Sequence, residues 1–157
     1  MDERPLVHIY CDGACSPNPG WGGWGAVLIA PEHGGYRREL SGAEPNTTNN
    51  RMELTGALMA LRALKRPSRV VVHTDSLYLK NAFEKRWLHS WQRNGWVTSS
   101  KTAVLNQDLW QELLALTAMH EVTWTWVPGH STDAENNRCD ELAVAARLEL
   151  ARQAGSI

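Results

Sequence analysis

The sequence predicts an α/β domain: a five-stranded mixed sheet flanked by helices, in the order β-β-β-α-β-α-α-β-α. Three strand-like runs come first, and the short links between them favour antiparallel hairpins. A helical segment then joins the third strand to a fourth, and a helical crossover favours parallel pairing. The chain has 157 residues, which predicts a single domain with its core at about 6–150.

The first part of the chain is expected to hold four of the strands and one helix. A Gly- and Pro-rich loop at 16–23 separates the first two strands, and Thr48 or Asn49 can cap a helix that continues to about Leu64. Pro67 closes this helix, because proline lacks the backbone N–H that a helix interior requires. The strands are predicted at 6–12, 24–30, 36–42 and 69–74.

The second part is expected to hold the last strand and the remaining helices. The helical pattern breaks near Asn94 and Gly95, and separate helices are predicted at 76–93, 105–119 and 135–152. The strand at 121–127 alternates strictly, which predicts that one of its faces points into the core. That inward face carries Val122, Trp124 and Trp126.

Charge is distributed unevenly along the chain. The net charge of −1 and the pI near 6.6 argue by themselves against a nucleic-acid partner. Between residues 80 and 101, however, five basic residues accompany one acid and three tryptophans. Aromatic rings among cations suit a polyanion that carries flat bases, whereas the alternative is a solvated helix whose tryptophans pack inward. The residues are Lys80, Lys85, Arg86, Arg93, Lys101, Glu84, Trp87, Trp91 and Trp96.

Targeting signals and cysteine usage favour a cytoplasmic protein. No window approaches ~20 uninterrupted apolar residues, so no membrane span is expected. The N-terminus lacks the apolar stretch of a signal peptide, and the three cysteines are expected to be reduced thiols. Cys11 and Cys15 have the spacing with which a zinc site can begin, but no second Cys/His pair follows at a suitable distance.

Four carboxylates define the candidate site. Asp12 and Asp75 each end an apolar, strand-like run, and Glu53 is expected in a first helical turn, where the helix dipole favours an anion. Desolvating a carboxylate is costly unless a positive group meets it, and no Lys or Arg stands beside Asp12 or Asp75 in the sequence. If the two strands are parallel neighbours, both acids lie at one sheet edge, where Asp140 of the last helix can join them. The pattern therefore predicts a shared divalent cation and metal-dependent chemistry.

The residues around these acids resemble the motif set of type 1 ribonuclease H over roughly residues 6–150. The resemblance implies a five-stranded mixed sheet and an endonuclease that cleaves the RNA strand of RNA/DNA hybrids with Mg²⁺ or Mn²⁺. Since the first strand is predicted to start about six residues in, the N-terminal hybrid-binding domain of some members is expected to be absent. The motifs are Tyr10-Cys11-Asp12-Gly13-Ala14-Cys15, Asn49-Asn50-Arg51-Met52-Glu53-Leu54, His73-Thr74-Asp75-Ser76, and Gly129-His130 followed by Glu135-Asn136-Asn137-Arg138-Cys139-Asp140-Glu141-Leu142-Ala143.

The resemblance also implies a role for each catalytic residue. Asp12 would bridge two metal ions, Asp75 and Asp140 would help to hold the ion beside the nucleophile, and Glu53 would hold the ion beside the leaving group. His130 is expected to assist proton transfer or the release of product and metal, with Glu135 near it. The products would carry 5′-phosphate and 3′-hydroxyl ends.

Substrate contacts are implied along both strands of the hybrid. The RNA minor groove would meet Asn18, Asn49 and Asn50 and the backbone of the Cys15-Ser16 loop. Ser76 is also expected to bind the substrate. Thr48 and Asn106 match a pocket for a DNA phosphate, and Tyr78, Trp91 and Ser99 match the DNA channel. Because these groups grip the backbone of the duplex, cleavage is expected to be independent of sequence. The protein is also expected to be a monomer.

The chain departs from the better-known bacterial pattern at two places. Gln92-Arg93 stands where a basic pair is common, and Leu77 stands where some members carry a polar RNA contact. The first departure predicts weaker affinity and a shallower dependence on salt.

Two alternatives use the same fold. A non-catalytic hybrid-binding module would have lost at least one of the four acids, and this chain retains them all. A junction resolvase would carry its carboxylates in other contexts and would have no purpose for the asparagines that meet the 2′-hydroxyl groups.

Overall fold

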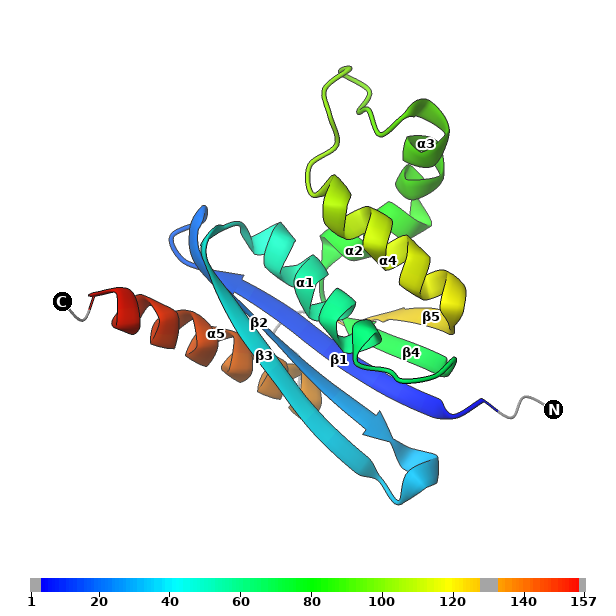
Figure 1. Cartoon of the computed structure of the whole chain (residues 1–157), viewed down its shortest axis with the longest axis vertical. Coiled ribbons are helices and arrows are strands. Elements are labelled where there is room, and N and C mark those ends of the chain that lie inside the picture. The colour runs from blue at the N-terminus through cyan, green and yellow to red at the C-terminus, as the bar shows by residue number, and fades with distance from the viewer. Residues whose placement is uncertain (1–3, 128–132, 156–157) are drawn as a thin grey trace.

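The computed structural model describes residues 4–127 and 133–155, and a mixed β-sheet forms its centre. The strands of this sheet lie in the order β3-β2-β1-β4-β5 (Figure 1). β1 pairs antiparallel with β2, as does β2 with β3, whereas β1 with β4 and β4 with β5 are parallel pairs. The strands are β1 (Leu6–Cys15), β2 (Gly20–Ala30), β3 (Tyr36–Thr47), β4 (Arg69–Thr74) and β5 (Glu121–Trp126). The predicted mixed sheet of five strands is confirmed.

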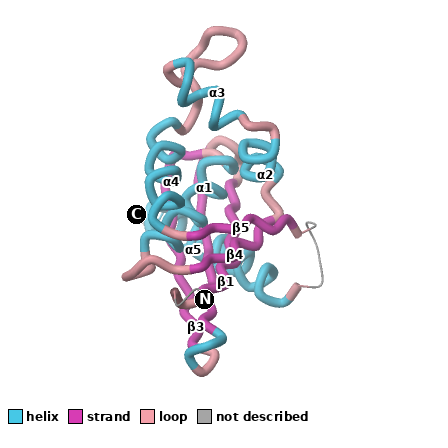
Figure 2. The backbone as a smooth tube through the Cα atoms, turned by 90° about the vertical axis from the view of Figure 1, so that its right-hand side faces the viewer, coloured by secondary structure: helices cyan, strands magenta, loops and turns pink. Residues whose placement is uncertain are grey.

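Helices cover both faces of the sheet. α1 packs on β1 and β2 with α4 beside it, and α5 crosses the opposite face over β1, β2 and β3 (Figure 1). α3 and the loop after it project away from the sheet, and the second view shows the same projection (Figure 2). The helices are α1 (Asn49–Arg62), α2 (Leu77–Glu84), α3 (Trp87–Asn94), α4 (Gln107–Met119) and α5 (Ala134–Gly155), and a short 3₁₀ turn, η1 (Pro31–His33), links β2 to β3. Within the described chain, no helix has the length and apolar character needed to cross a membrane.

The main core lies between the sheet and α1. Alternate residues of β1 point toward this helix, and Ile9 and Cys11 have no exposed surface. α1 contributes buried side chains that lie one turn apart to this core, among them Leu54, Leu58 and Leu61. Thr48 caps this helix by accepting a hydrogen bond from the backbone N–H of Arg51 at 3.1 Å, which confirms one of the two predicted caps.

Several predicted boundaries are wrong. The single helix expected at 76–93 is two helices, because Arg86 adopts a left-handed conformation (φ 59°) that interrupts the helical hydrogen bonds. The loop expected at 16–23 is shorter, since β2 already begins at Gly20 and β1 continues to Cys15. Glycine has a low propensity for strands, but here the pairing of β2 with β1 and β3 overrides this low propensity.

Trp126 corrects the predicted inward face of β5. Trp124 is half-buried and stacks on Phe83 with ring centroids 4.5 Å apart, as an inward residue should. Trp126 is 41% exposed, and the Nζ of Lys80 lies 4.6 Å from the centre of its ring. β5 is the edge strand of the sheet, and the core does not cover its last residue, Trp126. The cation of Lys80 packs on the exposed Trp126 ring instead.

Candidate active site

Parallel pairing of β1 with β4 brings Asp12 and Asp75 to the same edge of the sheet. Tyr10 lies opposite His73 in this pairing, and each acid stands two residues further along its chain. Asp75 directly follows β4, as predicted. Asp12 lies within β1 opposite Gly25, so the prediction that it ends the strand is wrong.

Glu53 reaches this edge from α1. It stands in the second turn of the helix, not in the predicted first turn. A side chain on Gly13 would overlap the backbone of Met52 and Glu53, so the chain just after Asp12 lies directly against the helix that carries Glu53. One Glu53 oxygen accepts a hydrogen bond from Nδ2 of Asn49 at 3.2 Å, and the other accepts one from the Ser76 hydroxyl.

Asp140 comes from α5 on the opposite face of the sheet. The preceding residue, Cys139, has no exposed surface and packs against the sheet, whereas Asp140 itself is exposed. Its charge contributes to the raised pKa of Asp12, as do the charges of Asp75 and Glu53. The structure therefore brings the four predicted acids into one electrostatic cluster.

The electrostatics of this cluster are those of carboxylates without a counter-charge. Burial, and then the charge of Asp75, raise the pKa of Asp12 to about 8, although the backbone N–H of Gly13 donates to it at 2.9 Å. Burial raises the pKa of Glu53 to about 7, against the opposing effect of the Ser76 hydrogen bond. Across residues 4–127 and 133–155, none of the four acids forms an ion pair with Lys or Arg.

The donor chemistry of the cluster fits a hard divalent cation. Carboxylate oxygens are the ligands that Mg²⁺ and Mn²⁺ prefer, and a cation would relieve the repulsion that raises the pKa of Asp12. In the described part of the chain, no three His, Cys, Asp or Glu side chains lie close enough together to form a metal-ligand set. The zinc alternative has no support there, because Cys11 is fully buried and the Cys15 thiol is directed at the carbonyl oxygens of Pro17 and Thr47.

Residues predicted to contact RNA surround this cluster. The backbone N–H of Asn49 donates to Oδ1 of Asn18 at 3.1 Å, which joins the β1–β2 loop to the start of α1. Ser16 and Asn50 are exposed beside them, and Cys15 is half-buried. Ser76 differs from the others, because its side chain is buried.

Residues predicted to contact DNA gather around Arg51, which sequence reasoning missed. The Arg51 guanidinium donates to Oδ1 of Asn106 at 3.4 Å and binds both carboxylate oxygens of Asp108 at 3.0 and 2.7 Å. Its backbone N–H binds the Thr48 hydroxyl, and Asn106 donates to the Tyr78 hydroxyl at 3.3 Å. Arg51 therefore links Thr48 and Asn106, the two residues of the predicted phosphate pocket, and Asn106 links this pocket to Tyr78 of the predicted DNA channel.

Trp91 and Ser99 lie in the projecting part of the molecule. The half-buried Trp91 ring has its centroid 5.9 to 6.1 Å from those of three other tryptophans, Trp87, Trp96 and Trp110. Ser99 is exposed in the loop that follows α3. Trp91 therefore belongs partly to a packed aromatic cluster, in addition to its predicted place in a DNA channel.

The predicted histidine, His130, lies outside the described residues. Its predicted companion Glu135 begins α5, and the Arg37 side chain binds both of its carboxylate oxygens at 2.8 and 3.3 Å. Arg37 is a second residue that sequence reasoning missed. No local signal was available for it, because its partner is 98 positions away.

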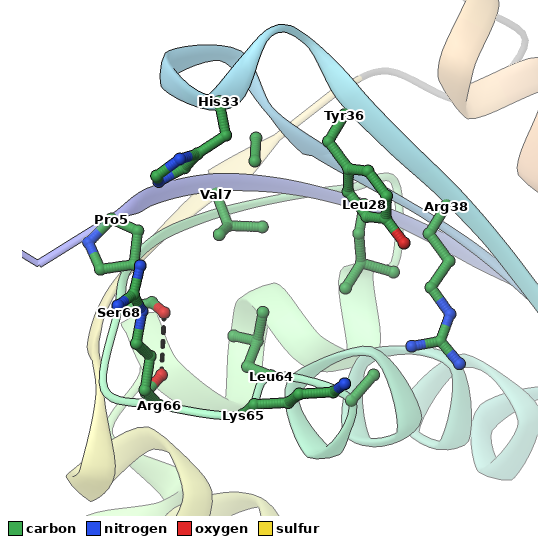
Figure 3. Close-up of a pocket in the computed structure, with 12 residues that line it drawn as sticks. Pro5, Val7, Leu28, His33, Tyr36, Arg38, Leu64, Lys65, Arg66 and Ser68 are labelled. Atoms are coloured by element: carbon green, nitrogen blue, oxygen red, sulfur yellow. Dashed lines mark hydrogen bonds between the residues drawn. The ribbon is translucent and has the colours of Figure 1, made fainter.

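The candidate site is distinct from the apolar cavity at the other end of β1. A cavity of about 390 Å³ lies at the opposite end of β1, with Val7, Leu28 and Leu64 inside and Arg38 and Lys65 at its margin (Figure 3). None of the predicted catalytic or substrate-binding residues lines it.

Known proteins share both the sequence and the fold. The family model described as RNase H matches residues 4–147. A Ribonuclease H of Moorella thermoacetica is 61% identical over 147 residues, covering 94% of this chain and 95% of the relative. A Ribonuclease HI of Neisseria meningitidis is 53% identical over 137 residues, covering 87% and 92%. LC9-RNase H1, described as a type 1 RNase H with the type 2 active-site motif, has a TM-score of 0.83 at 36% identity and covers 95% of this chain and 75% of its own. This chain therefore belongs to the ribonuclease H family, among the bacterial type 1 enzymes.

Proposed function

We propose that the protein is an endoribonuclease that hydrolyses the RNA strand of RNA/DNA hybrids with the help of two divalent cations, Mg²⁺ or Mn²⁺. The observation that carries this proposal is that β1 and β4 pair in parallel and put Asp12 and Asp75 at one edge of the sheet, where the charges of Glu53 and Asp140 also act on Asp12. None of the four acids has a Lys or Arg partner among the described residues. The names of the curated relatives support the same substrate class.

The four acids would divide the work of holding the cations. Asp12, the most central of them, would contact both ions, Asp75 and Asp140 the ion beside the attacking water, and Glu53 the ion beside the leaving oxygen. When bound, the two ions activate water and stabilise the leaving oxygen. The protein's own contribution is to hold four oxygen ligands at an edge where a phosphodiester can approach, and to leave coordination positions for phosphate and water.

Selection of the RNA strand would rest on groups beside the acids. Asn18 and Asn49 are joined by a hydrogen bond next to Glu53, and their remaining amide atoms can meet ribose 2′-hydroxyl groups. The Thr48, Tyr78 and Asn106 surface would hold a phosphate of the DNA strand, with Arg51 as its cation. These are backbone contacts, so cleavage would be independent of sequence.

One experiment tests the proposal directly. Labelled RNA/DNA, RNA/RNA and DNA/DNA duplexes are incubated with the protein in Mg²⁺ and in EDTA. We expect cleavage of the RNA strand of the hybrid alone, dependent on the cation, with 5′-phosphate and 3′-hydroxyl ends. A hybrid that stays intact in Mg²⁺, or cleavage that persists in EDTA, would refute it.

A further inference from the structure

We propose that Ser76 is a positioning residue for Glu53: its buried hydroxyl holds the Glu53 carboxylate in the orientation in which it receives a metal ion. This inference rests on the proposed function, because it concerns the metal site of that reaction. It also gives Ser76 a different role from the substrate contact predicted for it. Three features of the structure carry it.

The first feature is burial. Ser76 is 2% exposed, whereas Asn18 and Asn50, which are predicted to contact RNA, are exposed. A duplex approaches from solvent, so a hydroxyl that solvent does not reach is poorly placed to touch it. The same burial suits a group that acts on another side chain of the protein.

The second feature is the direction of the hydroxyl proton. A serine hydroxyl has one proton and two acceptor lone pairs. The Ser76 oxygen accepts the backbone N–H of Leu79 at 3.1 Å, which makes it the N-cap of α2, and its proton is directed to Oε2 of Glu53. The backbone N–H of Ser76 donates to the Thr74 hydroxyl at 3.1 Å, so the donor is itself held in place.

The third feature is the connection that this hydrogen bond makes. The other donor to Glu53, Asn49, stands four residues earlier on the same helix. Ser76 instead follows β4 and is the immediate neighbour of Asp75, so its hydrogen bond ties the acid of α1 to the acid at the end of β4. Fixing the orientation of a metal-binding carboxylate in this way typically changes metal affinity by about 10–100-fold.

The test compares metal binding by the wild type and the Ser76→Ala variant. Mn²⁺ is titrated calorimetrically into each metal-free protein in the absence of nucleic acid. We expect the dissociation constant for Mn²⁺ to rise about 10-fold in Ser76→Ala. The Mg²⁺ concentration for half-maximal hybrid cleavage should rise in proportion, while KM for the hybrid at saturating Mg²⁺ stays that of the wild type.

Two further variants separate positioning from stability. Ser68→Ala is the matched control, because Ser68 is also 2% exposed, stands just before β4 and directs its hydroxyl to the carbonyl oxygen of Arg66 at 2.9 Å. Ser76→Gly removes the same hydroxyl, but glycine is a tolerated N-cap, so the cost to α2 is small. We expect wild-type Mn²⁺ affinity for Ser68→Ala and the weakened affinity of Ser76→Ala for Ser76→Gly, with folding of each checked by urea denaturation.

A double-mutant comparison with Glu53→Gln decides the mechanism. If Ser76 acts through Glu53, the double variant Ser76→Ala/Glu53→Gln should bind Mn²⁺ with the same affinity as the single variant Glu53→Gln. Wild-type Mn²⁺ affinity in both Ser76→Ala and Ser76→Gly would overturn the inference. If, in addition, KM for the hybrid were raised in these variants, Ser76 would be a substrate contact. If the wild type itself neither binds Mn²⁺ nor cleaves the hybrid, the proposed function fails instead.

Discussion

Gly25 lies directly beneath the backbone carbonyl oxygen of Cys139. A side chain at Gly25 would overlap that oxygen, and one at Gly23 would overlap the carbonyl oxygen of Ala143 one turn further along α5. Gly25 also lies opposite Asp12 in the pairing of β1 with β2, and Cys139 precedes Asp140. The close approach of α5 to β2 therefore sets how near Asp140 comes to Asp12.

Gly25→Ala should both destabilise the protein and impair cleavage. The added methyl group meets backbone, which cannot rotate away, so α5 must shift off the sheet and carry Asp140 with it. We expect the free energy of unfolding to fall by about 2–4 kcal/mol in urea denaturation, together with a lower kcat. Gly155→Ala is the control, because that position faces open space. Wild-type stability in Gly25→Ala would mean that the helix is not held by this contact.

Asp12→Asn should abolish cleavage while hybrid binding persists. The amide keeps the size of the side chain but cannot serve as a bridging anionic ligand. The rate is measured in Mg²⁺ and the dissociation constant by fluorescence anisotropy with a labelled hybrid. Glu84→Gln, which neutralises an exposed carboxylate on α2, should keep wild-type turnover. Wild-type turnover in Asp12→Asn would remove the proposed metal bridge.

The metal-free protein should lose stability as the pH rises from 7 to 9. The folded-state pKa of Asp12 is about 8 and that of Glu53 about 7, both above the unfolded value of about 4. The native state therefore binds more protons than the unfolded state, and this stability is lost as the pH passes through 7 and 8. We expect a loss on the order of 1 kcal/mol in urea denaturation with EDTA.

Two comparisons attribute this pH dependence to the acidic cluster. Asp12→Asn should make the loss smaller, because its amide does not titrate, and saturating Mg²⁺ should make it smaller still. Glu53 and the buried thiols of Cys11 and Cys139, whose pKa values burial raises, contribute the remainder in the Asp12→Asn variant. Burial lowers the pKa values of His73 and His120, so their contribution has the opposite sign and cannot produce a loss of stability with rising pH. A stability that rises between pH 7 and 9 in EDTA would contradict the electrostatic description of the site.

Trp91→Ala should weaken hybrid binding and also cost stability. Base stacking on an aromatic ring contributes about 1–3 kcal/mol, so the dissociation constant should rise about 10-fold, measured in the Asp12→Asn background to prevent cleavage. Trp91 also packs against Trp87, Trp96 and Trp110, and its loss leaves a gap among them. Trp91→Phe retains an aromatic ring and should recover most of the affinity. An unchanged affinity in Trp91→Ala would assign this residue to packing alone.

His130→Ala should slow turnover by about 10–100-fold, less than Asp12→Asn, because proton transfer assists the reaction without holding the metal ions. The comparison is made at saturating hybrid and Mg²⁺, across pH 6–9. A loss as complete as that of Asp12→Asn would give His130 a direct part in the metal site.

The sequence by itself determined that the sheet has five strands, their order along the chain and the three acids that lie near Asp12. Alternation in β1 and the cap at Thr48 are local patterns, because each depends on residues within one or two turns of the chain. The helix before β4 predicted a parallel neighbour for this strand, but only the structure shows that the neighbour is β1, which puts Asp12 and Asp75 at one edge.

Only the tertiary structure decided which side chains meet across these elements. Ser76 reaches Glu53, Arg51 reaches Asp108 and Arg37 reaches Glu135 over 23, 57 and 98 positions, and no local pattern specifies such pairs. The same limit explains Trp126, since alternation gives the face of a strand but not how far its neighbours cover that face. Hydrophobic periodicity is a property of one segment, whereas the distance between two polar atoms depends on how all the segments pack.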